Sequence, residues 1–130
     1  MTMIFVNGTF DILHTGHLEL LAYARSLGDF LHVGIDSDRR VKELKGSSRP
    51  IYNQQERKTM LEALRYVDSV HIFDSDNDLR ALIADCDVMV KGDDYQGQPI
   101  VGQEVCKQII FFKKINGYST TQKISDITNR

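Results

Sequence analysis

Two of the chain's four histidines, His14 and His17, stand three residues apart in the stretch NGTFDILHTGHLELL. Residues three apart share one face of a helix, so both imidazoles would point the same way from a first helical turn. Gly16 between them lets a ligand approach the backbone closely. A helix start also offers N–H donors and a partial positive charge, which favour anions. This pattern predicts a polyphosphate site, beside the backbone N–H groups of residues 8–10.

Two other interpretations of the histidine pair stay open at this point. His14, His17 and Asp11 together are a partial metal site, although no further ligand stands at the usual spacing. A histidine at a helix start can also serve only as a cap or a surface residue. Neither familiar phosphate-binding pattern, GxxxxGK[ST] or GxGxxG after a strand, is present in the sequence.

A second polar group lies near the other end of the chain, in KKINGYSTTQKISDI. Ser119, Thr120 and Thr121 stand where a last helix is expected to begin, and hydroxyl side chains there ordinarily cap the helix. The same hydroxyl and N–H groups can donate to a phosphate, and Lys114 would add positive charge. Capping and ligand binding are compatible.

Charged residues form two more clusters. The first is KELKGSSRPIYNQQER, which is either a solvated face or a mobile lid over a triphosphate; its cations are Lys42, Lys45, Arg49 and Arg57. The second is Gly92-Asp93-Asp94-Tyr95, which follows an apolar strand. Its carboxylates are suited to a cation or a sugar hydroxyl, and equally to an ordinary turn.

The elements that must position these residues alternate between strand and helix. Short apolar runs predict strands at 3–7, 30–35, 70–73, 88–91 and 109–112. Helical periodicity predicts helices over 17–27, from a cap at Asn53 to Val67, over 79–86, near 101–108 and from Ser119. This alternation indicates an α/β fold with a parallel sheet covered on both faces. In such sheets ligands bind at the carboxyl ends of the strands, where the histidine stretch begins.

Length and composition exclude several classes of protein. The 130 residues fit one domain, and the net charge of −2 argues against binding nucleic acid through the overall field. No apolar run approaches the roughly 20 residues needed to span a bilayer, and no signal peptide is recognisable. The two cysteines, Cys86 and Cys106, are expected to be reduced thiols of a cytoplasmic protein.

Together these residues resemble the cytidylyltransferase-like nucleotidyltransferases. The resemblance covers nearly the whole chain in order and rests on Gly8-Thr9-Phe10-Asp11, His14-Thr15-Gly16-His17, Arg65 with Asp68 in LRYVD, and Ser119-Thr120-Thr121. It implies that residues 1–130 form a single Rossmann-like three-layer domain of the HxGH type. Its parallel sheet would have about five strands.

Two branches of this family fit the sequence. LKGSSRPI (44–51) and VKGDDY with IVGQE (90–104) resemble the adenylyltransferase domain that activates heptose 1-phosphate. GTFD, RYVD, GDD and GYSTT look equally like glycerol-3-phosphate cytidylyltransferase. Thr9 and Asp93 replace the cysteine and second glycine usual in the first branch, while Tyr95 and Lys114 replace the tryptophan and arginine typical of the second. The longer matches favour the heptose-like branch.

The resemblance also implies a reaction and its residues. A phosphate oxygen of a sugar or polyol acceptor would attack the α-phosphorus of ATP or CTP and expel pyrophosphate, with Mg²⁺ arriving on the nucleotide. His14, His17 and Lys45 would be catalytic, and Asp11, Arg65 and Asp94 would bind the acceptor. The nucleotide would contact Gly8, Thr9, Phe10, His14, Gly16, His17, Lys114, Gly117, Ser119, Thr120 and Thr121.

The expected partners are therefore small molecules, with no nucleic acid and no membrane, and a cytoplasmic homodimer is expected. No protein side chain is assigned to a metal. Two alternatives from other classes are a nucleotide-binding domain without catalysis and a metal-dependent hydrolase.

Overall fold

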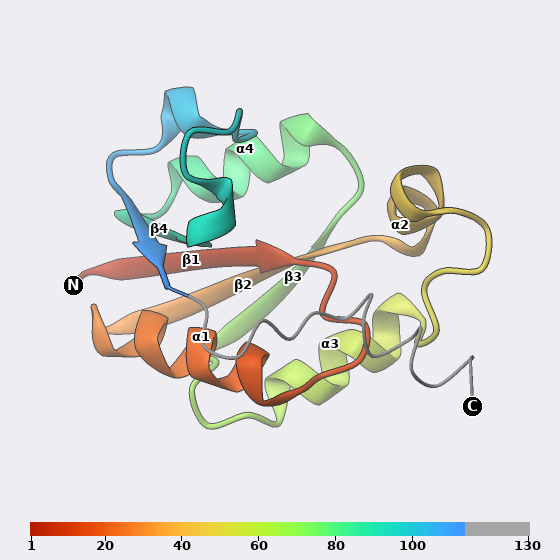
Figure 1. Cartoon of the computed structure of the whole chain (residues 1–130). Helices are drawn as coiled ribbons and strands as arrows, with labels where there is room; N and C mark the ends of the chain where they lie inside the picture. Colours follow the sequence, from red (N-terminus) through yellow and green to blue (C-terminus); the bar gives the residue numbers. More distant parts are fainter. Residues whose placement is uncertain (114–130) are drawn as a thin grey trace.

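Five parallel strands form the centre of the molecule in the computed structural model, which describes residues 1–113 (Figure 1). They are β1 (Met3–Gly8), β2 (Phe30–Asp36), β3 (Ser69–Phe73), β4 (Val88–Gly92) and β5 (Ile109–Phe112). Their order in the sheet is β3-β2-β1-β4-β5, and every neighbouring pair is parallel. The five predicted strands and the parallel sheet are confirmed.

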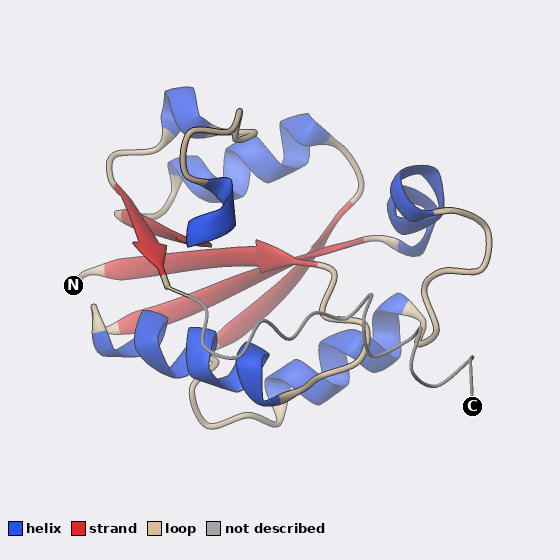
Figure 2. Ribbon diagram, in the orientation of Figure 1, coloured by secondary structure: helices blue, strands red, loops and turns tan. Residues whose placement is uncertain are grey.

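Helices cover both faces of this sheet, which gives three layers (Figure 2). On one face α1 (Thr15–Ser26) and α3 (Gln54–Glu62) pack through Leu21, Ala24 and Leu61 against β1 and β2. On the other face α4 (Asp76–Ala84) packs through Leu79 and Ile83 against Phe5, Phe73 and Met89. Among residues 1–113, no helix is long and apolar enough to cross a membrane.

Each of the four described α-helices begins where a polar side chain satisfies an N–H group of the first turn. Asn53 accepts from the Glu56 N–H at 2.9 Å, as its spacing predicted. Ser37 and Ser75 do the same for α2 (Asp38–Lys45) and α4. The caps of α2 and α4 lie shortly after the carboxyl ends of β2 and β3.

The helices differ from the prediction in three places. α2 lies in a stretch predicted as a loop, because DRRVKELK buries only Val41 and shows no apolar stripe. The helix expected near 101–108 is a single 3₁₀ turn, Gln103–Val105, preceded by Gly102 with a positive φ of 86°. The helix from Asn53 ends at Glu62 rather than Val67. The helix expected from Ser119 lies outside the described residues.

The order of the strands locates the crevice in which such sheets bind ligands. The chain runs outward from β1 to β2 and β3, then returns to the other side of β1 for β4 and β5. The order therefore reverses between β1 and β4, and ligands bind at the carboxyl edge near that point. The loop after β1, the start of α1 and the end of α2 all lie at this edge (Figure 1).

Candidate active site

The two histidines of HTGH form the first turn of α1 and cap it themselves. His14 is the N-cap residue, and its Nδ1 accepts the Gly16 N–H at 3.1 Å. His17 Nδ1 accepts the His14 N–H at 3.2 Å, so the pair makes a reciprocal capping box. A neutral ring whose Nδ1 accepts a hydrogen bond carries its proton on Nε2. Both histidines therefore present an Nε2–H donor.

The two rings are held together as one unit. Their centroids are 3.9 Å apart and their planes differ by 25°, so they stack. On the other side, the buried Phe10 ring lies 5.1 Å from the His17 ring. Phe10 has a φ of 50°, and a side chain at Gly8 would come within 3.1 Å of its ring. Gly8 thus lets Phe10 fold back against His17, which fixes the direction of the imidazole.

Asp11 ties this loop to the segment that precedes α3. Its carboxylate is 2 % exposed and accepts the N–H groups of Ile51 at 2.7 Å and Tyr52 at 2.8 Å. Each carboxylate oxygen of Asp11 therefore accepts one backbone N–H. Within residues 1–113 no group of three His, Cys, Asp or Glu side chains is placed to hold a metal ion.

Arg57 fastens three segments of the site to one another. It is 1 % exposed and donates to the carbonyl oxygens of Thr9 at 2.9 Å, Asp36 at 2.8 Å and Tyr52 at 3.0 Å. It also pairs with Asp38 at 2.9 Å. The sequence left a solvated face and a mobile lid open for this stretch. Arg57 fits neither, because it is buried inside α3 and bonds the ends of β1 and β2.

Lys45 and Lys91 place positive charge at the same edge, around the carboxylate of Asp36. Asp36 ends β2, pairs with Arg40 at 2.8 Å, and lies 3.5 Å from the Thr9 hydroxyl. Lys45 ends α2, and desolvation together with the charge of Arg49 lowers its pKa. Lys91 lies in β4, where burial lowers its pKa to about 8 in spite of the attraction of Asp36 and Asp94.

The sequence analysis did not assign Lys91, Asp36 or Asn7 to the site. The Lys91 ammonium lies 4.7 Å from the centre of the Tyr95 ring, on the strand next to β1 at the reversal of strand order. The Asn7 side-chain oxygen is buried and has no hydrogen-bond partner in the described chain. The available signal was a charged residue near the end of a mostly apolar strand, as in VMVKG and FLHVGID.

Replacing Lys91 by methionine is expected to stabilise the protein at pH 7 by about 1–3 kcal/mol. The lowered pKa means that the buried ammonium opposes folding wherever both states are protonated, below about pH 8. Between about 8 and the unperturbed value of 10.5, the folded state releases this proton first and the free energy of unfolding rises. Urea unfolding from pH 7 to 10 should show this rise for the wild type relative to Lys91→Met.

The matched control is Lys107→Met, at a lysine whose side chain is 66 % exposed. It should leave both the stability and its pH dependence nearly unchanged. Equal effects of the two substitutions would contradict the burial of Lys91 as the cause.

The remaining predicted residues fall into three groups. Asp94 follows β4 at the carboxyl edge, in the short 3₁₀ turn Asp93–Tyr95. Arg65 lies between α3 and β3, where it stacks on Tyr66, and the neighbouring Asp68 bonds Leu31 at the start of β2. Arg65 is thus at the amino edge, and the described chain does not bring it to His14 and His17. The third group lies outside the described residues: Lys114, Gly117, Ser119, Thr120 and Thr121.

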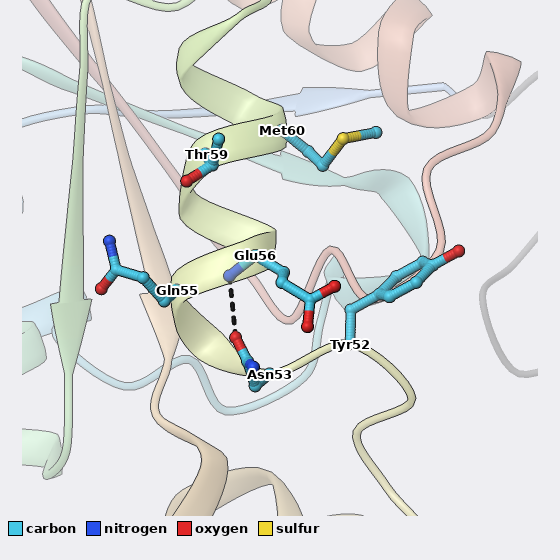
Figure 3. Close-up of a pocket in the computed structure, with 6 residues that line it drawn as sticks. All are labelled: Tyr52, Asn53, Gln55, Glu56, Thr59 and Met60. Carbon is cyan, nitrogen blue, oxygen red and sulfur yellow. Dashed lines mark hydrogen bonds between the residues drawn. The ribbon is translucent and has the colours of Figure 1, made fainter.

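A separate hollow of about 520 Å³ lies along the exposed side of α3 (Figure 3). Its lining contains none of the residues predicted for the site; it consists of Tyr52, Asn53, Gln55, Glu56, Thr59 and Met60. Tyr52 connects the hollow with the site, because its N–H donates to Asp11 and its carbonyl oxygen accepts from Arg57.

The HTGH helix start lies at the strand-order reversal of a parallel sheet. The family model described as cytidylyltransferase-like matches residues 5–124, and the chain belongs to this family.

Among its curated relatives are proteins named bifunctional protein HldE. The one from Campylobacter fetus is 47 % identical over 97 % of this chain, and the one from Campylobacter concisus is 46 % identical over 98 %. The one from Aliarcobacter butzleri is 44 % identical over 96 %. The chain spans only 28 % of the length of the first two relatives and 26 % of the third.

Solved structures confirm the fold. A lipopolysaccharide core biosynthesis protein from Thermoplasma volcanium superposes with a TM-score of 0.72 over 89 % of this chain and 99 % of its own, at 23 % identity. A protein of unknown function from Archaeoglobus fulgidus superposes with a TM-score of 0.67 over 92 % of this chain and 94 % of its own, at 18 % identity.

Proposed function

We propose that this domain transfers the AMP group of ATP to the phosphate of a sugar 1-phosphate, of the heptose 1-phosphate type. The observation that carries the proposal is the capping box of HTGH, in which the Nδ1 of each histidine accepts a backbone N–H. In a neutral ring this places the remaining proton on Nε2. Two further features support the heptose-like branch. The HldE relatives are 40–47 % identical over nearly the whole chain, and LKGSSRPI resembles that branch.

The reaction proceeds by in-line displacement. An oxygen of the acceptor phosphate attacks the α-phosphorus of ATP; the new P–O bond forms as the bond to the β-phosphate oxygen breaks, and pyrophosphate leaves with that electron pair. No covalent intermediate on the protein is needed. The chain contributes positioning and charge stabilisation. His14 and His17 donate to oxygens of the α- and β-phosphates, and the N–H groups of Thr9 and Phe10 lie beside them. Lys45 neutralises charge where the acceptor phosphate approaches the nucleotide.

The nucleotide and its metal ion complete the proposed site. The phosphate oxygens of ATP would hold Mg²⁺, which would share the neutralisation of charge. We also propose that Ser119, Thr120, Thr121 and Lys114 bind the triphosphate, that Asp94 binds the acceptor, and that the protein works as a cytoplasmic homodimer.

A second candidate is cytidylyl transfer to glycerol 3-phosphate. Thr9 and Asp93 favour it, because both depart from the heptose-like pattern and fit the glycerol-like one. The two candidates share the site and the chemistry, and differ in the base and in the acceptor.

Thermal unfolding with ATP, CTP, GTP or UTP plus magnesium separates these candidates. A ligand at about 100 times its Kd stabilises by roughly 2.7 kcal/mol, which raises the midpoint by several degrees. We expect the shift with ATP, and pyrophosphate release from ATP with a sugar 1-phosphate but not with glycerol 3-phosphate. The opposite pattern, a shift with CTP and turnover with glycerol 3-phosphate, would replace the first candidate by the second. Binding without turnover of either acceptor would favour a non-catalytic nucleotide-binding domain.

A further inference from the structure

Arg49 carries a buried positive charge whose hydrogen bonds are incomplete. The residue is 7 % exposed, and its Nε and one terminal guanidinium nitrogen are buried without a hydrogen-bond acceptor anywhere in residues 1–113. Its nearest counter-charge is Asp11, whose Oδ2 lies 3.6 Å from Nε. Leaving charged donors buried and unsatisfied is costly, so such an arrangement is expected where a ligand supplies the missing acceptor.

A second cation stands close to this guanidinium. Lys45 ends α2 four residues before Arg49, and the charge of Arg49 contributes to lowering the Lys45 pKa. Two cations this near each other repel in the absence of a ligand. Their repulsion turns into a shared attraction when a dianion lies between them.

The carboxylates nearby are already engaged with other groups. Asp11 accepts the backbone N–H groups of Ile51 and Tyr52. Asp36 pairs with Arg40 at 2.8 Å, and Asp38 pairs with Arg57 at 2.9 Å. The ion pair of Arg49 with Asp11 does not satisfy the guanidinium, because 3.6 Å is too long for a hydrogen bond.

We propose that Arg49, with Lys45 beside it, binds the phosphate monoester of the acceptor substrate. This rests on the proposed nucleotidyl transfer, in which the acceptor phosphate must approach the α-phosphate of the nucleotide. Asp11 binds the two residues that follow Pro50, which holds Arg49 against the loop leading into HTGH. The bidentate guanidinium suits a phosphate dianion, and a cation between two approaching anions reduces their repulsion.

Titration calorimetry with inorganic phosphate tests the site without requiring turnover. Arg49→Gln should weaken phosphate binding by about 10- to 100-fold, the usual effect of losing charged hydrogen bonds. Lys45→Gln should also weaken phosphate binding. Arg39→Gln is the matched control, since that arginine is exposed on α2 and pairs with Glu43 and Asp74. Equal phosphate affinity in the wild type and in both site variants would overturn the proposal.

Two further measurements identify which substrate, the acceptor or the nucleotide, binds at Arg49. Phosphate should still bind when the protein is saturated with a non-hydrolysable ATP analogue, and the analogue's affinity should be the same in Arg49→Gln. In turnover, Arg49→Gln should raise KM for the acceptor at least 10-fold and leave KM for ATP unchanged. Displacement of phosphate by the analogue, or weaker analogue binding in Arg49→Gln, would assign Arg49 to the nucleotide instead. If wild type shows no turnover, the proposed function fails while the phosphate titrations still decide the anion site.

Discussion

Replacing His17 by glutamine is expected to lower turnover by about 100- to 1,000-fold while the protein stays folded. That is the usual loss when one preorganised donor to a developing charge is removed. Glutamine is chosen because it is an ordinary residue at the third position of a capping box, so its amide oxygen can still accept the His14 N–H. His17→Ala should lose as much turnover and, in addition, the capping bond.

Steady-state pyrophosphate release, with the thermal midpoint as a check on folding, measures this effect. The control is His71→Gln, the same substitution on β3 away from HTGH, which should leave turnover within about twofold of the wild type. A folded His17→Gln or His17→Ala protein with normal turnover would contradict the role given to the imidazole.

Replacing Arg57 by alanine is expected to destabilise the protein by about 3–5 kcal/mol. The guanidinium is fully buried and donates to three carbonyl oxygens from three different segments, so its removal leaves those acceptors without partners. Arg57→Lys should recover little, because an ammonium cannot reproduce the fork geometry that reaches Thr9, Asp36 and Asp38 together. Urea unfolding provides the measurement.

Arg39→Ala is the comparison for this prediction. Arg39 makes two ion pairs, with Glu43 at 2.8 Å and Asp74 at 3.0 Å, but its side chain is 54 % exposed. Exposed pairs contribute about 0–1 kcal/mol, so this variant should stay close to the wild type. An Arg57→Ala variant that lost no more stability than Arg39→Ala would contradict the view that Arg57 holds the segments of Thr9, Asp36 and Tyr52 together.

The strand pattern and the histidine spacing were readable from the sequence because each is local. Runs such as MIFV in β1 and VMV in β4 are apolar throughout, as strands buried on both faces must be. HTGH lies at the first turn of α1, as its spacing predicted. The cap at Asn53 was equally visible, three residues before Glu56.

The features that the sequence did not indicate depend on contacts between distant segments. Arg57 and Arg49 look alike in a charged stretch, yet one bonds the ends of two strands and the other is left with unsatisfied donors. α2 was missed because its helix is set by the Ser37 cap and by ion pairs rather than by an apolar stripe. Lys91 could be assigned to the site only once the strand order was known, because that order places β4 beside β1.

The fate of each phosphate of ATP tests the central claim most directly. The protein would be incubated with magnesium, a sugar 1-phosphate and ATP labelled at either the α- or the γ-phosphorus. Nucleotidyl transfer predicts that the α-label enters the nucleotide-activated sugar and the γ-label leaves in pyrophosphate. Transfer of the γ-label to the sugar, or its release as inorganic phosphate, would contradict attack at the α-phosphorus and with it the roles assigned to His14 and His17.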